Sequence, residues 1–257
     1  MSIKIPVISC VCVTRNKPQM LKKVIACFTA QSYPEKELVI VYEDDDVATD
    51  ELVNEAAIIS RDDIQLVRIK SFPKTTLGEL RNIGIHTAKG EFICQWDDDD
   101  WYHKDRLAEQ YNAAVNHDRE GAVMTRWLVF DAIDRQAYIS NKRMWEGSVL
   151  CRKSVLQLMP YEDKSIGEDS ATIDYLVSQK CLHPMNGVPG LYIYIYHGGN
   201  TWNFDHWSYI FECSTALSYD HSQCIADILD GNYTVYAGSL LLDKILQSEY
   251  IDKRILG

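Results

Sequence analysis

Apolar runs alternate with amphipathic stretches along the first hundred residues. Runs rich in Val, Ile and Cys predict strands at 7–13, 37–43, 64–69 and 91–96. The intervening segments predict helices at 18–31, 49–60 and 76–88. Pro18 suits a first helical turn, Thr49 or Asp50 can cap the second helix, and Lys89-Gly90 closes the third. Alternating strands and helices predict an α/β fold with a mostly parallel sheet covered on both faces.

The second half of the chain is less regular. We expect strands at 121–130 and 191–196, a strand or loop at 144–154 that leads into a short helix, and helices within 213–257. The apolar clusters for those last helices are at 225–229, 235–246 and 251–256. Glu168-Asp169 opens a further predicted helix, with apolar residues at 173, 176 and 177. Acidic residues in a first turn are also ordinary helix-dipole chemistry.

Polar segments follow three of the predicted strands. They are Thr14-Arg15-Asn16, Glu43 to Asp46 and Asp97 to Asp100. Carboxyl ends of parallel strands meet at one edge of a sheet, where ligands bind. An isolated acidic run is most often a solvated loop, but two that converge suit a hard divalent cation with a diphosphate. We therefore expect a metal-assisted phosphate site at this edge.

The amino-acid composition limits the possible kinds of partner and the cellular compartment. The 257 residues are 46% apolar, which suffices for one large core, and the formal net charge of −11 argues against nucleic acid as a partner. The eight cysteines are scattered without a CxxC pair, which is typical of free thiols in a reducing cytoplasm. No signal-peptide pattern and no membrane-spanning run is found.

Two long motifs resemble one enzyme family. They are VISCVCVTRNKPQMLKKVIACFTAQSYPEKELVIVYEDDD and LGELRNIGIHTAKGEFICQWDDDDWYHKDRL, which contains an Asp-x-Asp (DXD) element. Both are similar to glycosyltransferases of family 2, which have the GT-A (Rossmann-like) fold. The resemblance implies an inverting, metal-dependent transfer of a sugar from a nucleotide-sugar donor. UDP is the expected nucleotide, with GDP and dTDP open, and Mn²⁺ or Mg²⁺ is the expected cofactor.

The resemblance also implies a donor site. The implied nucleotide-binding residues are Thr14, Arg15, Glu43, Asp44, Gly78, Arg81, Asp97 and Asp98. The implied metal ligands are Asp99, Asp97 and His197. For Arg81, a salt bridge beneath the acidic edge is an equal alternative to nucleotide binding. For His197, capping of the strand is an equal alternative to metal binding. His206 is a weaker candidate for a metal ligand.

For the acceptor side, the resemblance implies a carboxylate base in Gly167-Glu168-Asp169. Inverting transfer needs a base that takes the proton of the acceptor hydroxyl. We assign Asp169 as base and Glu168 to acceptor hydroxyls or helix positioning, with exchanged roles as the rival. Acceptor or sugar contacts are expected from Trp101, Trp145, Glu146 and Trp202. Core packing is the alternative for the three tryptophans, and an equal one for Trp145. Residues 200–202 would close over the diphosphate.

The family resemblance sets the expected organisation. We expect a catalytic domain at 1–212, with a nucleotide-binding half at 1–110 and an acceptor half with a small β element at 111–212, and a packed helical extension at 213–257. The Gln-x-x-Arg-Trp element of processive relatives is absent, so we expect one sugar per encounter. The expected acceptor is a glycan or lipid-linked glycan of surface polysaccharide or lipopolysaccharide biosynthesis, at the cytoplasmic face of the membrane. Peripheral membrane association and a homodimer are open.

Three rival functions remain. A nucleotidyltransferase would carry a glycine-rich phosphate loop after the first strand, but TRNKPQML contains no glycine. A phosphatase with an aspartate nucleophile would place it where Thr14-Arg15 stands. A non-catalytic sugar-nucleotide-binding module on the same fold would not need the acidic residues Asp97, Asp99 and Asp169.

Overall fold

A seven-stranded sheet forms the larger part of the computed structural model, which describes residues 5–248. Its order is β10 (Leu182–Met185), β6 (Gly121–Met124), β9 (Leu150–Arg152), β4 (Phe92–Gln95), β1 (Ile8–Val13), β2 (Lys36–Glu43) and β3 (Ile64–Ile69). Only β9 runs antiparallel to its neighbours, so the mostly parallel sheet is confirmed.

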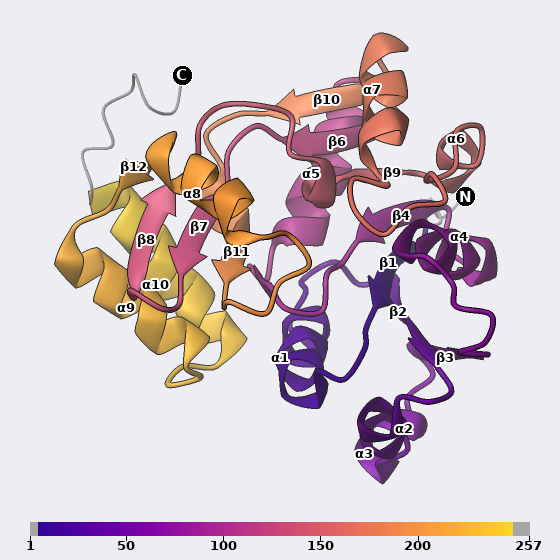
Figure 1. Cartoon of the computed structure of the whole chain (residues 1–257). Helices are drawn as coiled ribbons and strands as arrows, with labels where there is room; N and C mark the ends of the chain where they lie inside the picture. Colours follow the sequence, from indigo (N-terminus) through magenta and orange to yellow (C-terminus); the bar gives the residue numbers. More distant parts are fainter. Residues whose placement is uncertain (1–4, 249–257) are drawn as a thin grey trace.

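Helices cover both faces of this sheet (Figure 1). They are α1 (Pro18–Thr29), α2 (Val47–Val53), α3 (Ala56–Ile59), α4 (Leu77–Thr87), α5 (Arg106–Asn116), α6 (Lys153–Leu156) and α7 (Ser170–Ser178). Alternate residues of β1 belong to two apolar clusters: Cys10 and Cys12 pack with α1 residues, and Val11 with α4 residues. Burial on both faces explains why β1 is apolar throughout.

A smaller sheet of five strands lies beside the first (Figure 1). Its order is β12 (Thr215–Ala216), β8 (Gln136–Ile139), β7 (Leu128–Asp131), β11 (Tyr192–Tyr196) and β5 (Trp101–Tyr102). Helices α8 (Phe204–Glu212), α9 (Tyr219–Leu229) and α10 (Val235–Ser248) pack around it, and two 3-10 turns, η1 (Glu146–Ser148) and η2 (Pro189–Leu191), complete the described elements. This sheet is larger than the expected small β element. It contains β5, β8 and β12, which the sequence analysis did not predict.

Two predicted elements are wrong in their extent. The single strand predicted at 121–130 is two strands, β6 and β7, in different sheets. The chain turns between them because Thr125 is bonded to Met185 and Asn186 by its hydroxyl group. The single helix predicted at 49–60 is α2 and α3, since Glu55 is extended with ψ of 137°.

The cap predicted for this second helix is also wrong. Asp46, rather than Thr49 or Asp50, is the N-cap of α2, because its carboxylate accepts the Thr49 N–H at 3.0 Å. The same carboxylate accepts the Asn16 N–H at 2.7 Å and so joins α2 to the end of β1.

The last third of the chain is only partly as expected. Helices α9 and α10 confirm the clusters at 225–229 and 235–246, whereas the cluster at 251–256 lies outside the described residues. Because β12 pairs with β8, residues 215–216 extend the smaller sheet. The division at 212/213 stays a prediction. No helix among residues 5–248 is long and apolar enough to cross a membrane.

Candidate active site

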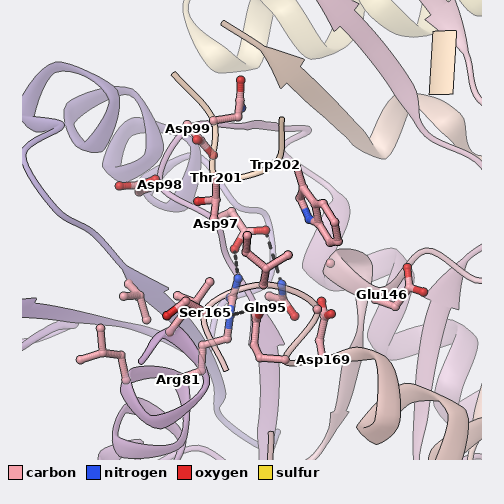
Figure 2. A pocket seen from close by; sticks show the side chains of 18 of the residues that line it. Arg81, Gln95, Asp97, Asp98, Asp99, Glu146, Ser165, Asp169, Thr201 and Trp202 are labelled. Carbon is pink, nitrogen blue, oxygen red and sulfur yellow. Dashed lines mark hydrogen bonds and ion pairs between the residues drawn. The ribbon is translucent and has the colours of Figure 1, made fainter. Parts of the chain in front are cut away.

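A cavity of about 470 Å³ opens at the carboxyl ends of β1, β2 and β4. The first wall carries Thr14, Glu43 and the Asp97–Asp99 segment. The second wall is formed by segments near 143–147, 165–170 and 199–202. Figure 2 shows Asp97, Asp98 and Asp99 on one side and Glu146 and Asp169 on the other. The topology therefore brings the predicted donor loops together with the predicted Glu-Asp pair.

Arg81 joins the two walls of the cavity. Its Nη2 donates to Asp97 Oδ1 at 2.8 Å, and its Nε donates to Glu168 Oε1 at 2.9 Å (Figure 2 labels Arg81 and Asp97). The Arg81 and Glu168 side chains are 8% and 5% exposed. The predicted salt bridge beneath the acidic edge is thus present. Its effect is to fix Asp97 relative to the segment that carries Asp169.

Lys17 and His197 contact the other two aspartates of this segment. Lys17 Nζ lies 3.1 Å from Asp98 Oδ1 and 2.7 Å from Asp99 Oδ2. His197 Nε2 lies 3.1 Å from the same Asp99 oxygen. Burial alone would raise the pKa of Asp99, but the His197 hydrogen bond and the Lys17 charge lower it. Burial and the charge of Asp99 raise the pKa of Asp98 to about 6.

The predicted metal shell of three protein side chains is not assembled. No group of three or more His, Cys, Asp or Glu residues within 5–248 is arranged to hold a metal ion. Asp97 is held by Arg81 instead, because a buried guanidinium neutralises it. Asp99 and His197 do lie together, and a carboxylate with an imidazole fits a divalent ion whose remaining ligands come from a diphosphate.

Thr14, Arg15 and Glu43 line one end of the cavity. Arg15 pairs with Glu43 and also with Asp45, at 2.8 Å. Glu43 is 4% exposed, and its Oε1 has no hydrogen-bond partner among the described residues. A buried acceptor without a donor costs free energy, which a ligand N–H or a water molecule at this point would recover.

Two predicted nucleotide contacts lie outside the cavity. The Asp44 carboxylate accepts the Ser71 N–H at 2.9 Å, and this bond with the Lys70 ion pair lowers its pKa to about 2. A Cβ at Gly78 would stand 1.8 Å from the Glu162 carbonyl oxygen. Gly78 therefore permits close packing of α4 against the 162–168 segment, which corrects its predicted contact with the nucleotide.

Asp169 differs from its neighbour Glu168. Its carboxylate lines the cavity, and no described residue donates a hydrogen bond to it. Burial, followed by the charge of Glu168, raises the pKa of Asp169 to about 7. Glu168, in contrast, is held by Arg81. A carboxyl group with a pKa near neutrality is suited to accept a proton.

Aromatic side chains form the wall beside Asp169. Trp127, Trp145, Tyr194 and Trp202 line the cavity. Trp145 is 3% exposed and packs 4.6 Å from Trp127, so it serves the core and the cavity surface together. Trp202 is 39% exposed and stacks on His206, with ring centroids 4.2 Å apart. Glu146 lines the same wall and pairs with Arg143.

The predicted sugar contact of Trp101 is wrong. Trp101 is 6% exposed, does not line the cavity, and packs near His103 and Gly238 on the α10 side. The cause is the pairing of β5 with β11, which turns this indole into the core.

The cavity residues that sequence reasoning missed include Lys17, Gln95, Trp127, Arg143 and Tyr194. Lys17 directly follows the predicted Thr14-Arg15-Asn16 segment, so its position at a strand end was an available signal. Trp127 and Tyr194 lie inside predicted strands, and only the arrangement of the second sheet turns them to the cavity.

Comparison with known proteins decides the family. The model of "Glycosyl transferase family 2" matches residues 9–167, which is more than half of the chain. The chain belongs to glycosyl transferase family 2. Its predicted membership is thereby confirmed.

Relatives agree with the family. The amylovoran biosynthesis glycosyltransferase AmsB of Erwinia amylovora is 26% identical over 162 residues, which are 63% of this chain and 47% of AmsB. The chain thus spans about half the length of this curated relative.

Solved structures show the fold. TarS 1–349 of S. aureus has a TM-score of 0.57 at 14% identity, covering 95% of this chain and 73% of that one. The mannosyltransferase PcManGT of Pyrobaculum calidifontis, solved with GDP-Man and Mn²⁺, has a TM-score of 0.56 at 14% identity, covering 96% and 71%. The GT-A fold predicted for this family 2 chain is confirmed.

Proposed function

We propose that this chain is an inverting, metal-dependent glycosyltransferase that moves one sugar from a UDP-sugar to a hydroxyl group of a glycan or lipid-linked glycan. The observation that carries the proposal is the unpaired Asp169 carboxylate, which faces the Asp97–Asp99 segment across one cavity. An inverting transfer needs one base on the face of the sugar opposite the leaving group.

The free Glu43 oxygen supports the choice of nucleobase. Glu43 Oε1 needs a donor, and uracil, thymine and guanine each present a ring N–H beside a carbonyl group. Cytosine and adenine present an exocyclic amino group instead, so a carboxylate would hold these bases in a different position. TarS has been solved with UDP and with UDP-GlcNAc, and PcManGT with GDP-Man, so nucleotides of this kind bind related folds.

Asp99 and His197 would hold the divalent ion. When bound, the ion stabilises the departing diphosphate. We call the first wall of the cavity the donor wall and the second wall the acceptor wall, after the proposed substrates. Arg81 keeps Asp97 in place on the donor wall, where the Asp97 carboxylate faces the cavity beside Gln95 (Figure 2). These contacts support a donor site ordered before the nucleotide arrives.

Asp169 would take the proton of the acceptor hydroxyl as that oxygen attacks the anomeric carbon. The new C–O bond forms while the bond from the anomeric carbon to the diphosphate breaks, and the configuration inverts. Because Glu168 is engaged by Arg81, the base role falls to Asp169 rather than to Glu168. Trp145, Trp202 and Glu146 would contact the acceptor or the sugar.

The biological setting follows from relatives. AmsB is a biosynthesis enzyme of amylovoran, which supports a role in surface polysaccharide or lipopolysaccharide synthesis. We propose action in the cytoplasm, at the cytoplasmic face of the membrane. Peripheral membrane association and a homodimer belong to the same proposal.

Calorimetric titration tests the donor site. UDP, GDP, dTDP and CDP are each titrated with Mn²⁺ and with EDTA, and we expect UDP to bind with Mn²⁺ and CDP to fail. Asp99→Asn should lose the metal-dependent affinity, whereas Asp44→Asn, altered outside the cavity, should keep it. Absence of binding by all four nucleotides, or equal binding in EDTA, would overturn the proposal.

A further inference from the structure

Lys17 occupies the cation position of the site. Its ammonium group contacts Asp98 Oδ1 at 3.1 Å and Asp99 Oδ2 at 2.7 Å. The Lys17 side chain is 26% exposed, against 8% and 14% for the two carboxylates, so the pairs are largely shielded from solvent. Ion pairs this sheltered are screened less by salt than surface pairs.

The Asp99 oxygen that Lys17 contacts is the one that faces His197, whose Nε2 lies 3.1 Å away. These are the atoms proposed to hold the divalent ion. An ammonium group and a divalent cation cannot share one carboxylate oxygen without strong mutual repulsion. Entry of the metal therefore requires Lys17 to leave.

The Lys17 ammonium group can reach other positions in the cavity. Lys17 lines the cavity that the diphosphate would fill, and its four-carbon stem allows several positions for the charged end. It directly precedes Pro18, the first residue of α1, so its backbone is fixed beside the donor loops. A diphosphate in the cavity would offer it new anionic partners.

We propose that Lys17 is an exchangeable counter-ion of the metal site. Without nucleotide it neutralises Asp98 and Asp99 in place of the metal, and it moves onto the donor diphosphate when metal and nucleotide bind together. This inference rests on the metal site of the proposed function. It makes metal and nucleotide binding mutually dependent, because each favours the state in which Lys17 has left the aspartates.

Removal of the Lys17 charge should change the affinities for Mn²⁺ and for UDP in opposite directions. Lys17→Met should bind Mn²⁺ without nucleotide about tenfold more tightly than the unaltered protein, since no ammonium competes. The same variant should bind UDP in saturating Mn²⁺ about fivefold to tenfold more weakly, since a diphosphate partner is lost. Free Mn²⁺ is measured by electron paramagnetic resonance, and UDP binding by calorimetry.

Matched variants control the experiment. Lys22→Met alters another lysine of α1, paired at the surface with Glu55, and should change neither affinity. Lys17→Arg keeps the charge and should bind Mn²⁺ alone as weakly as the unaltered protein. Lys17→Gln repeats the test if Lys17→Met does not fold, as judged by circular dichroism.

The outcomes distinguish this inference from the proposed function. Unchanged or weaker Mn²⁺ binding by folded Lys17→Met and Lys17→Gln would overturn the counter-ion role, even where the unaltered protein binds UDP with Mn²⁺. Failure of the unaltered protein to bind any nucleotide would instead remove the function on which the inference rests.

Discussion

The Asp97–Asp99 segment and Asp169 lie on facing walls of the cavity and differ in whether their carboxylates are paired. On the donor wall each aspartate of the Asp97–Asp99 segment has a cationic or imidazole partner, supplied by Arg81, Lys17 and His197. On the acceptor wall no described residue donates a hydrogen bond to Asp169, whose pKa is raised to about 7. All three aspartates of the donor wall are therefore paired, whereas on the acceptor wall Glu168 and Glu146 are paired with arginines and Asp169 is not.

This difference separates holding a ligand from accepting a proton. A cation beside a carboxylate favours its ionised form, and the carboxylate can exchange that partner for another cation. An uncompensated, buried carboxylate has a higher proton affinity, which a general base needs. Glu168 shows that sequence proximity does not decide the role, because it adjoins Asp169 but belongs to the compensated set.

The largest expected effect comes from removal of the uncompensated carboxylate. Asp169→Asn should lower the transfer rate by about 10²- to 10⁴-fold, because the amide cannot accept the proton. UDP affinity with Mn²⁺ should stay unchanged. Single-turnover transfer and calorimetry measure the two quantities. Asp174→Asn, exposed on the same helix α7, is the control, and an active Asp169→Asn enzyme would place the base elsewhere.

An effect on global stability, rather than on the transfer rate, is expected when Arg81, which joins the two walls, is removed. Arg81→Met leaves Asp97 and Glu168 without their shared cation and should lower the free energy of unfolding by about 3–5 kcal/mol. Urea denaturation measures the loss.

The control for Arg81 is a surface ion pair. Arg135 and Asp230 are 42% and 50% exposed, so Arg135→Met should cost less than about 1 kcal/mol. Similar losses for the two arginine variants would contradict the contrast between buried and exposed pairs.

The smallest expected effect is a shift in the pH dependence of the transfer rate. Asp169 acts in its ionised form and its pKa is raised to about 7, so the rate should fall about tenfold per unit as pH drops below that value. Glu146 is among the charges that raise this pKa, so Glu146→Gln should move the acidic limb to lower pH, by less than about one unit. A limb that moves upward, or one that persists in Asp169→Asn, would assign the titration to another group.

Much of the fold could be read from local pattern. The strands at 7–13 and 37–43 appear nearly as predicted because strands buried on both faces need continuous apolar runs. The strand at 64–69 also appears as predicted, although it is the half-buried edge strand β3. Helix α4 also appears close to the predicted range of 76–88, and the structure shows that it begins after Thr76, whose hydroxyl accepts the Glu79 N–H in a capping box. Local pattern failed at 121–130, since both β6 and β7 are apolar and only sheet pairing separates them.

The sequence by itself determined which carboxylates lie at strand ends and which pair opens α7. Only the tertiary structure decided their partners. Arg81 and Glu168 are 87 positions apart, and Lys17 and Asp99 are 82 apart, so no local periodicity links them. The same holds for Trp101, which reads like a cavity residue beside Asp100 but is turned into the core by the pairing of β5 with β11. Partner choice depends on packing across the whole chain. This packing pairs Glu168 with Arg81 and leaves the neighbouring Asp169 without a hydrogen-bond donor among the described residues.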